Sequence, residues 1–462
     1  MLISTVISLI YNETSFTPLL ISSSACILLG LLPVVLIEKI HEVKFHEGLA
    51  ISVIGWFVTC FTGLFPFYLW GGEFTFTNAL FESVSGYTTT GASILIDVEA
   101  LPKGLLFWRS STSFVGGLGI ILFVLLILPE KIEMRSYIYR AEVSTLSKMN
   151  FISRLRIVLR VVMSVYLILI ITETFILTFL GMSLFDSICH SFSTVATSGF
   201  SNKNLSISAY NNVWIEVVVI VFMLISSMHF GLIYGAFTGK KNSIFNSHVT
   251  SMYVFVLFIG VVLITMQLFN DKVYSFWESV RHAAFQVVSH ASTTGFATTD
   301  SANWPIFSVI LLLYFSVQCG MVGSTAGGIK FDRIYIYFAL LKNQIKMVLH
   351  PEGVYATKID NQIVNHSLQL QISVFIVIYI VTIVVSTLLL AALGVDGITS
   401  LSSSIATLGN VGPGFGSVSS LSNYSQLPDS AKYILSANML FGRLEIMNIL
   451  ALALLIVRKR ER

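Results

Sequence analysis

Four short segments rich in serine, threonine and glycine carry the residues of this chain that could bind an ion. They read ESVSGYTTTG at 82–91, HSFSTVATSG at 190–199, QVVSHASTTG at 286–295 and SSIATLGNVG at 403–412. A serine stands six residues before the final glycine in three segments, and Ala406 holds that place in the fourth. Backbone carbonyl oxygens can replace the hydration shell of a monovalent cation, so four equivalent segments predict a cation site.

Each segment is expected to form a short helix followed by an extended strand that ends at its glycine. The predicted helices are 75–87, 183–195, 278–290 and 398–407. A helix C-terminus carries about half a negative charge, so four of them aimed at one axis attract a cation. Glycine suits the last position because it adopts positive φ and leaves no side chain in the lumen. The predicted filter residues are Thr88, Thr89, Thr90, Gly91, Ala196, Thr197, Ser198, Gly199, Ser292, Thr293, Thr294, Gly295, Gly409, Asn410, Val411 and Gly412.

A single segment of this kind would be read as a polar loop between two helices. Small residues also gather where membrane helices pack closely. Neither alternative predicts the shared spacing from serine to glycine, nor the placement of all four segments on the same side of the membrane.

The elements that position these segments are membrane helices. The 462 residues are 55% hydrophobic and 11% charged, with a mean hydropathy of +0.82. Apolar stretches of about 20 residues, enough to cross a bilayer, recur along the chain. Because no basic region or cleavage pattern surrounds the first apolar residues, a signal peptide is not expected. The four cysteines, at irregular spacing in apolar segments, are read as reduced core residues and not as disulfides or a zinc site.

Helices are predicted at 17–37, 49–70, 105–128, 157–180, 213–235, 250–269, 305–319, 331–348, 368–393 and 431–457. Residues 2–10 are too short to span and stay unassigned. Lysine and arginine gather around 39–44, 131–160, 240–241, 330–358 and 458–462, which places these segments in the cytoplasm and the four serine-rich segments outside.

The expected fold is an all-α integral membrane protein with four repeats of helix, pore segment and helix around one central pore, plus an N-terminal transmembrane helix. The repeat is roughly 100 residues long. The expected division is 1–44 for the N-terminal segment, then 45–130, 131–240, 241–350 and 351–462 for the repeats.

The segment GSTAGGIK at 323–330 resembles a phosphate-binding loop but lacks its pattern, because Ile329 and not lysine follows the second glycine. Nucleotide binding is therefore rejected here. The run CGMVGSTAGG is poor in helix-forming residues and is expected to break the third repeat's second helix beneath the filter, which predicts an obstruction in the pore. The alternative is a kink that serves helix packing. The gating-loop residues are Gly320, Gly323, Ser324, Thr325, Gly327, Gly328 and Lys330.

Arg443 is predicted to lie mid-way along the last helix as a positive barrier to the ion, since a charge at this depth is costly and usually functional. The alternative is a salt bridge, for example with Glu445. Glu173 is an intramembrane acid without an evident partner and is read as a packing or dimer contact. His190 and His290 are read as structural histidines.

These segments resemble the Trk/Ktr/HKT family of potassium transporters, and most closely its TrkH-type members. The resemblance rests on FESVSGYTTTGAS, FSTVATSGFS, FQVVSHASTTGF, LGNVGPGFG, FWRSSTSFVGGLGI, GSTAGGIK and LPDSAKYIL with MLFGRLEI, and covers about residues 45–457. It implies a homodimer with one pore in each subunit, a cytosolic nucleotide-binding regulatory ring (TrkA-like) as partner, a gate at the intramembrane loop and an arginine facing the path. TrkH-type proteins have two complete helices before the repeats, whereas this chain offers one span and a short stub.

The resemblance links glycine at all four filter positions with potassium selectivity. The expected function is potassium uptake across the bacterial plasma membrane through a gated pore, with K⁺ bound at the filter as the transported ion. The alternatives are a pore of mixed potassium and sodium selectivity, suggested by the irregular Asn410 and Val411, and a sodium- or proton-coupled secondary transporter, disfavoured by the scarcity of intramembrane acids. No enzymatic motif and no cofactor are expected. Membrane lipid surrounds the chain, nucleic acid is not a partner, and the loops at 131–156 and 340–360 are the expected docking sites of the regulatory ring.

Overall fold

The computed structural model describes residues 1–36, 45–127, 151–237, 244–353, 355–359 and 362–460. Within these ranges, five helices are long and apolar enough to cross a membrane, or up to seven if each of two sharply bent pairs forms one span. The prediction of a multi-pass helical membrane protein is confirmed. Basic clusters at 39–44, 131–150 and 240–241, and part of the predicted docking loop at 131–156, lie outside the described residues.

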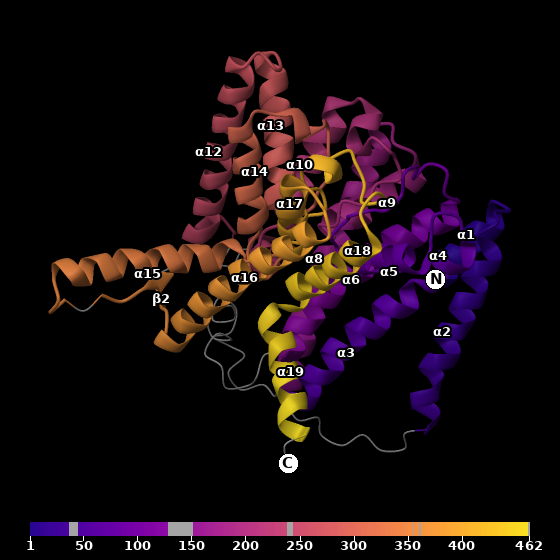
Figure 1. The fold of residues 1–462 in the computed structure, drawn as a ribbon, viewed down its shortest axis with the longest axis horizontal. Helices are drawn as coiled ribbons and strands as arrows, with labels where there is room; N and C mark the ends of the chain where they lie inside the picture. Colours follow the sequence, from indigo (N-terminus) through magenta and orange to yellow (C-terminus); the bar gives the residue numbers. More distant parts are fainter. Residues whose placement is uncertain (37–44, 128–150, 238–243, 354, 360–361, 461–462) are drawn as a thin grey trace.

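Four helical hairpins follow one another along the chain, each with a pore helix between the helices that flank it (Figure 1). The first contains α3 (Phe45–Gly63), α4 (Phe65–Trp70), α5 (Phe76–Tyr87) and α6 (Lys103–Ile127). The second contains α8 (Phe151–Phe179), α9 (Leu184–Val195), α10 (Val213–Ser226) and α11 (Phe230–Phe237). The third contains α12 (His248–Asn270), α13 (Phe276–Ala291), α14 (Ile306–Gln318) and α15 (Phe331–Leu349). The fourth contains α16 (His366–Ala392), α17 (Gly397–Leu408), α18 (Asp429–Leu444) and α19 (Ile446–Arg460).

The short helices α5, α9, α13 and α17 lie where the sequence predicts pore helices. Each begins after a residue that favours helix N-termini: Thr75, Ser183, Ser275 and Asp396. Three of these residues accept a hydrogen bond from a backbone N–H in the first turn, and Ser275 forms a capping box with Glu278, whose carboxylate accepts from the Ser275 N–H. Three of the helices have 12 residues and α13 has 16, so the third pore helix is about one turn longer.

Two helices precede the repeats. Residues 2–10, unassigned from the sequence, form α1 (Leu2–Ile10), and α2 (Phe16–Leu36) follows. The Ser8 and Ser15 hydroxyls are hydrogen-bonded at 2.7 Å. Between the helices, the Glu13 carboxylate accepts from the N–H groups of Lys103 and Gly104 at 2.8 and 2.9 Å, which caps the start of α6. The N-terminal pair is therefore fastened to the first repeat.

The sequence-based prediction of single helices at 213–235 and 431–457 is wrong. The axes of α10 and α11 differ by 105°, and those of α18 and α19 differ by 99°. Both breaks occur at polar residues, Ser227 and Glu445, that bind other parts of the fold. At the first break the Ser227 carbonyl accepts from the Met321 N–H at 2.8 Å. At the second, Glu445 has a φ of 59° and pairs with Arg333.

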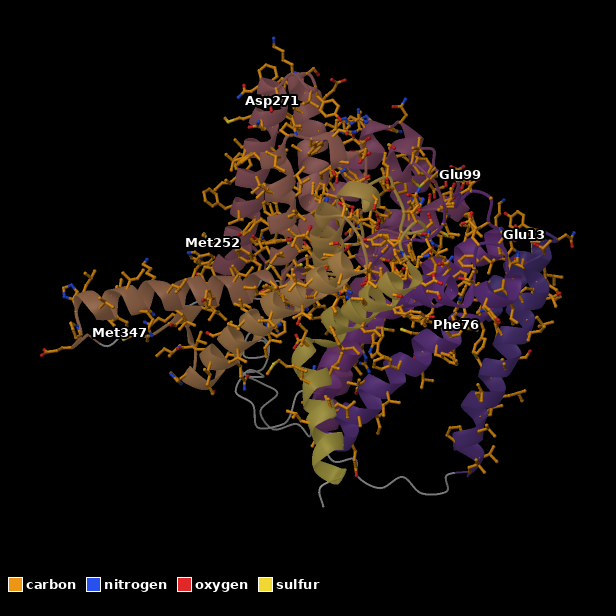
Figure 2. All side chains as sticks on the ribbon, in the orientation of Figure 1. Glu13, Phe76, Glu99, Met252, Asp271 and Met347 are labelled. Carbon is orange, nitrogen blue, oxygen red and sulfur yellow. The ribbon has the colours of Figure 1, made fainter. Side chains whose placement is uncertain are left out.

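The helix predicted at 331–348 exists as α15, but most of its length leaves the helical bundle (Figure 1). Figure 2 places Met347 near its far end, away from the other helices. The helix carries Asp332, Arg333, Lys342 and Lys346 among its apolar residues, so it is poorly suited to cross the hydrocarbon core. A hairpin of two short strands, β1 (Lys358–Ile359) and β2 (Gln362–Ile363), follows it.

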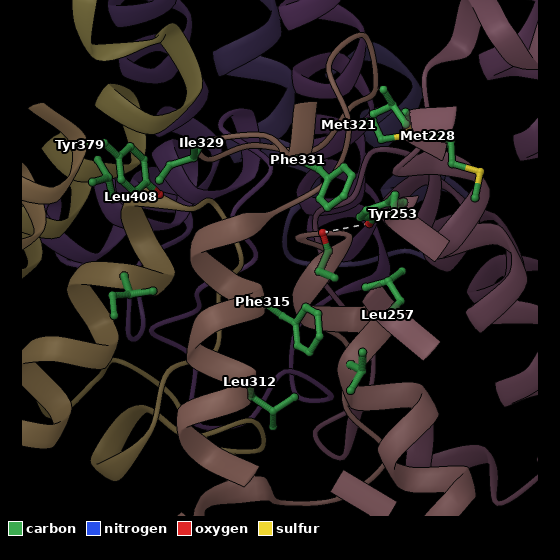
Figure 3. Close-up of a cluster of buried hydrophobic side chains, with 14 of the residues drawn as sticks. Met228, Tyr253, Leu257, Leu312, Phe315, Met321, Ile329, Phe331, Tyr379 and Leu408 are labelled. Atoms are coloured by element: carbon green, nitrogen blue, oxygen red, sulfur yellow. Dashed lines mark hydrogen bonds between the residues drawn. The ribbon is translucent and has the colours of Figure 1, made fainter. Parts of the chain in front are cut away.

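The core between the second, third and fourth hairpins is apolar and includes part of the break between α14 and α15. Figure 3 shows Met321 and Ile329 from this break together with Tyr253, Phe315 and Phe331. All five are buried, with at most 5% of each residue exposed. Four 3₁₀ helices complete the described structure: η2 (Ser206–Tyr210), η3 (Ile244–Asn246), η4 (Ser301–Asn303) and η5 (Gly416–Val418).

Candidate ion pathway

The four glycine-terminated strands meet in a closed ring, in the order of the sequence. A Cβ atom added to Gly91 would collide with the carbonyl oxygen of Ser198 in the second strand. The same collision joins Gly199 to the third strand, Gly295 to the fourth, and Gly412 back to the first, with the carbonyl oxygens of Thr294, Val411 and Thr90 respectively. The structure thus brings all four predicted segments together around one axis.

The backbone of each strand alternates in a way that the sequence alone does not specify. The second residue of each strand has positive φ, at 50° in Thr89, 54° in Thr197, 60° in Thr293 and 54° in Asn410. The glycines have φ between 77° and 97°. Residues of positive φ alternate with residues in ordinary conformations, which turns successive peptide groups so that N–H groups gather on one side and carbonyls on the other. Glycine is required at the closing position for both its φ and its lack of a side chain.

The N–H groups of the strands turn back to the pore helices. The third residue of each strand donates to the carbonyl of the residue six before the glycine. The pairs are Thr90 to Ser85 at 2.8 Å, Ser198 to Ser193 at 2.8 Å, Thr294 to Ser289 at 3.0 Å and Val411 to Ala406 at 2.8 Å. The serine spacing seen in the sequence therefore reflects a backbone carbonyl at that position, and this explains why alanine serves equally well in the fourth repeat.

The carbonyl oxygens of the strands remain without backbone donors. In the described part of the chain, the carbonyls of Thr90, Ser198, Thr294 and Val411 accept no hydrogen bond, although the residues themselves are completely buried. Buried carbonyls are normally paired, because an unpaired one loses its hydration without compensation. A ring of such oxygens can coordinate a dehydrated cation.

A buried ion pair behind the first strand escaped the sequence reading. The Arg109 Nε atom on α6 donates to Glu82 on α5 at 2.5 Å, and the other carboxylate oxygen accepts from the Ile94 N–H at 3.0 Å. Arg109 also donates to the Ser201 carbonyl at 2.8 Å and lies over the Phe200 ring at 3.6 Å. The sequence did contain a signal for this ion pair, because Glu82 and Arg109 are charged residues within predicted helices. The pair links the first pore helix to the segment after the second strand.

The predicted gating loop lies directly beneath the strands. The helix ends at Gln318 and resumes at Phe331, so the predicted break is confirmed. The Gly327 N–H donates to the Thr293 hydroxyl at 3.1 Å, and the Thr325 hydroxyl donates to the Val195 carbonyl at 2.9 Å. A Cβ on Gly327 would lie 2.6 Å from the Gly409 carbonyl oxygen. The loop thus contacts the strands or pore helices of three repeats.

The same loop is hydrogen-bonded to the break in the second repeat. The Met321 N–H donates to the Ser227 carbonyl at 2.8 Å, and the Phe230 N–H donates to the Gly323 carbonyl at 3.1 Å. A Cβ on Gly323, whose φ is +77°, would lie 2.6 Å from the His229 ring. Gly320 packs on Ser227.

The remaining loop residues make contacts within the loop and at its junctions with α14 and α15. The Ser324 hydroxyl donates to the Met321 carbonyl at 2.5 Å, and a Cβ on Gly328 would collide with Cys319. Lys330 is 8% exposed and precedes the first turn of α15.

Arg443 lies at the end of α18 and not mid-way along a continuous helix. It is 2% exposed; its guanidinium donates to the Thr325 carbonyl of the loop at 2.6 Å and to the Gly116 carbonyl of α6 at 2.9 Å. The alternative of a salt bridge with Glu445 is wrong, because Glu445 pairs with Arg333 at 2.6 Å. Within the described ranges, Arg443 has no carboxylate at salt-bridge distance, so its positive charge is not neutralised by a neighbouring acid.

The other polar residues singled out in the sequence lie away from the axis or face the helices. His190 is hydrogen-bonded at both ring nitrogens, to the Asp186 carbonyl at 2.8 Å and the Ser201 hydroxyl at 3.0 Å, as expected of a structural histidine. His290 bonds the Ser316 hydroxyl at 2.8 Å and stacks on Phe415. Glu173 on α8 is completely buried, and its carboxylate oxygens have no hydrogen-bond partner in the described structure.

Two carboxylates lie in the segment that follows the first strand. Asp97 accepts from the Asn204 amide at 2.8 Å, and this hydrogen bond lowers the pKa of the Asp97 carboxyl. Glu99 pairs with Lys203 at 3.0 Å, and Figure 2 shows Glu99 at the surface. Asp97 therefore stays ionised at neutral pH.

Fold and site together define a multi-pass membrane protein whose four pore segments form a ring of carbonyl oxygens above an intramembrane loop. The model of the TrkH family, described as cation transport protein, matches residues 19–459. The chain belongs to this family. It is 37% identical over 415 residues to the Trk system potassium uptake protein TrkH of Escherichia coli strain K12, covering 89% of this chain and 86% of that protein. It is 36% identical to the TrkH of Salmonella typhimurium over the same shares.

The fold agrees with a solved structure of the family. The crystal structure of the potassium transporter TrkH from Vibrio parahaemolyticus aligns with a TM-score of 0.89 and 31% identity, covering 98% of this chain and 94% of that one. The resemblance to TrkH-type transporters is thereby confirmed. The chain is a multi-pass protein of the bacterial inner membrane, as its relatives and its apolar helices indicate.

Proposed function

We propose that this protein takes up potassium through a gated, channel-like pore. The observation that carries the proposal is the ring of buried carbonyl oxygens contributed by four strands, in each of which the N–H group of the third residue is hydrogen-bonded to the pore helix. Such oxygens replace the water of a monovalent cation without presenting a net charge that would hold it too tightly. The names of the relatives supply potassium as the ion.

The four strands are proposed as the selectivity filter, with K⁺ as the transported ion and with no cofactor in this chain. The loop from Gly320 to Lys330 is the proposed gate, because it crosses directly beneath the filter and contacts it at Thr293. Arg443 is the proposed barrier, because its unneutralised charge below the filter repels a cation. Its guanidinium also holds the proposed gate through the Thr325 carbonyl. The proposed repeats remain 45–130, 131–240, 241–350 and 351–462, after the N-terminal segment 1–44.

Three of the acids within the helices favour passive conduction. Glu82, Glu216 and Glu445 are each paired with an arginine, so they are not free to exchange a coupling ion, whereas Glu173 is buried without an arginine partner among the described residues. A transporter of this kind is not expected to act as an enzyme. Its partners are proposed to be a second copy of the chain, forming a homodimer, and a cytosolic nucleotide-binding ring that docks near α15 and the hairpin of β1 and β2.

Flux in proteoliposomes tests the proposal. Vesicles are loaded with potassium and diluted into a potassium-poor buffer, with no sodium or proton gradient. They should accumulate tracer rubidium above its external concentration, driven by the potassium diffusion potential. Empty vesicles are the control. If uptake requires an added sodium or proton gradient, passive conduction is refuted; if sodium and potassium flow equally, the selective filter is refuted.

A further inference from the structure

Asn410 joins the last filter strand to the first. Its amide Nδ2 atom donates to the Thr90 hydroxyl at 3.0 Å and to the Met439 carbonyl of α18 at 2.9 Å. The side chain is completely buried. Across the described residues, this is the one side-chain hydrogen bond that connects the strands of two different repeats. The bond therefore spans the junction where the ring closes.

The other three repeats have threonine at the position of Asn410. The Thr197 hydroxyl donates to its own neighbour, the Ala196 carbonyl, at 2.6 Å, and the Thr293 hydroxyl accepts from the gating loop at Gly327. Neither reaches an adjacent strand. All residues at this position have positive φ, a conformation that asparagine tolerates better than most residues. Asparagine thus tolerates the positive φ at this position. Its side chain is also longer than that of threonine and ends in an amide with both a donor and an acceptor.

The far end of the amide is enclosed by glycines. The Asn410 Oδ1 atom has no donor among the described residues, and a Cβ added to either Gly327 or Gly442 would lie 2.7 Å from it. Gly327 belongs to the gating loop, and Gly442 immediately precedes Arg443. The amide therefore fills the space between the filter, the loop and the last helix, and it cannot move away from Thr90 without leaving that space empty.

We infer that Asn410 is a positioning residue that fixes the distance between the fourth and first filter strands and so helps the pore prefer potassium over sodium. The inference rests on the proposed function. Selectivity among monovalent cations depends on the number and placement of the coordinating carbonyls. The carbonyls of Thr90 and Val411 belong to the first and fourth strands. The hydrogen bond of Asn410 positions these two strands relative to each other. Without the bond, these strands can approach a smaller ion.

Bi-ionic reversal potentials of the purified protein in planar bilayers test this role, because they report the sodium-to-potassium permeability ratio independently of the amount of active protein. Asn410→Ala and Asn410→Thr should each raise the ratio about tenfold, the effect of losing the one buried hydrogen bond between the strands. Thr197→Ala, at the equivalent position without a bond between strands, should raise it less. Thr90→Val removes the acceptor and should match Asn410→Ala, and the double variant should add nothing further.

Each outcome bears on a different claim. A wild-type protein that does not distinguish the two ions overturns the proposed function. A selective wild type together with unchanged ratios in both Asn410 variants overturns the positioning role. Shifts that add in the double variant also overturn it, because the two residues would then act separately. Where Asn410→Ala aggregates on size-exclusion chromatography, Thr90→Val decides: an unchanged ratio in that variant refutes the inference.

Discussion

Replacing Arg443 should open the pathway. The guanidinium makes two charge-assisted hydrogen bonds, to Thr325 in the proposed gating loop and to Gly116 in α6. Each such bond contributes about 1.5–3 kcal/mol. A cation about 10 Å from the guanidinium is in addition repelled by about 1.7 kcal/mol, at an effective dielectric constant of about 20. The repulsion alone slows passage roughly 20-fold.

Three variants separate these contributions. Arg443→Gln removes the charge while keeping an amide donor, and it should raise rubidium influx into proteoliposomes by about 20-fold, the full effect of the lost repulsion. Arg443→Lys keeps the charge but loses the two-pronged donor, so its influx should rise by less than about fivefold. Arg443→Ala loses both and should exceed Arg443→Gln.

Influx is normalised to reconstituted protein, and each variant must elute from size-exclusion chromatography as the wild type does. An Arg443→Gln variant that elutes normally and conducts no faster than wild type would refute the barrier. Equal influx through Arg443→Lys and Arg443→Gln would show that the hydrogen bonds, and not the charge, oppose the ion.

Three further predictions concern the filter, the ion pair and the loop. Gly91→Ser should raise sodium uptake relative to potassium in a tracer competition assay, because its Cβ displaces a carbonyl of the next strand; an unchanged ratio would count against the filter. Glu82→Gln should lower the thermal unfolding temperature, since leaving Arg109 buried and unpaired costs about 3–5 kcal/mol, whereas an unaltered melting curve would refute that role. Gly323→Ala should loosen the gating loop by straining its positive φ against His229 and raise influx up to about tenfold, and slower influx would contradict this.

Much of the architecture follows from local sequence patterns. Membrane helices are recognised because a bilayer demands about 20 apolar residues in succession, and the pore helices were predicted to within a few residues because each follows a polar cap and precedes a small-residue run. The four glycines that end the pore segments were identified because the same local pattern occurs four times. The break in the third repeat was visible because its glycines disfavour helix within the segment itself.

Other features depend on contacts between distant residues, which leave no local pattern. The breaks at Ser227 and Glu445 lie in segments predicted as continuous helices and are stabilised by contacts with Met321 and Arg333 from another repeat. For the same reason, the sequence suggested a continuous last helix and offered Glu445 as an alternative partner for Arg443. In the structure the helix is broken, and Glu445 pairs with Arg333.

The sequence by itself determined that this is a four-repeat membrane protein with four glycine-ended pore segments, because hydrophobicity and backbone preference act over a few neighbouring residues. Only the tertiary structure decided that the strands close into a ring in chain order, that Arg443 is hydrogen-bonded to Thr325 in the loop beneath them, and that Asn410 bridges to Thr90. These hydrogen bonds join residues more than 100 positions apart, and their partners become neighbours only when the repeats pack around a common axis.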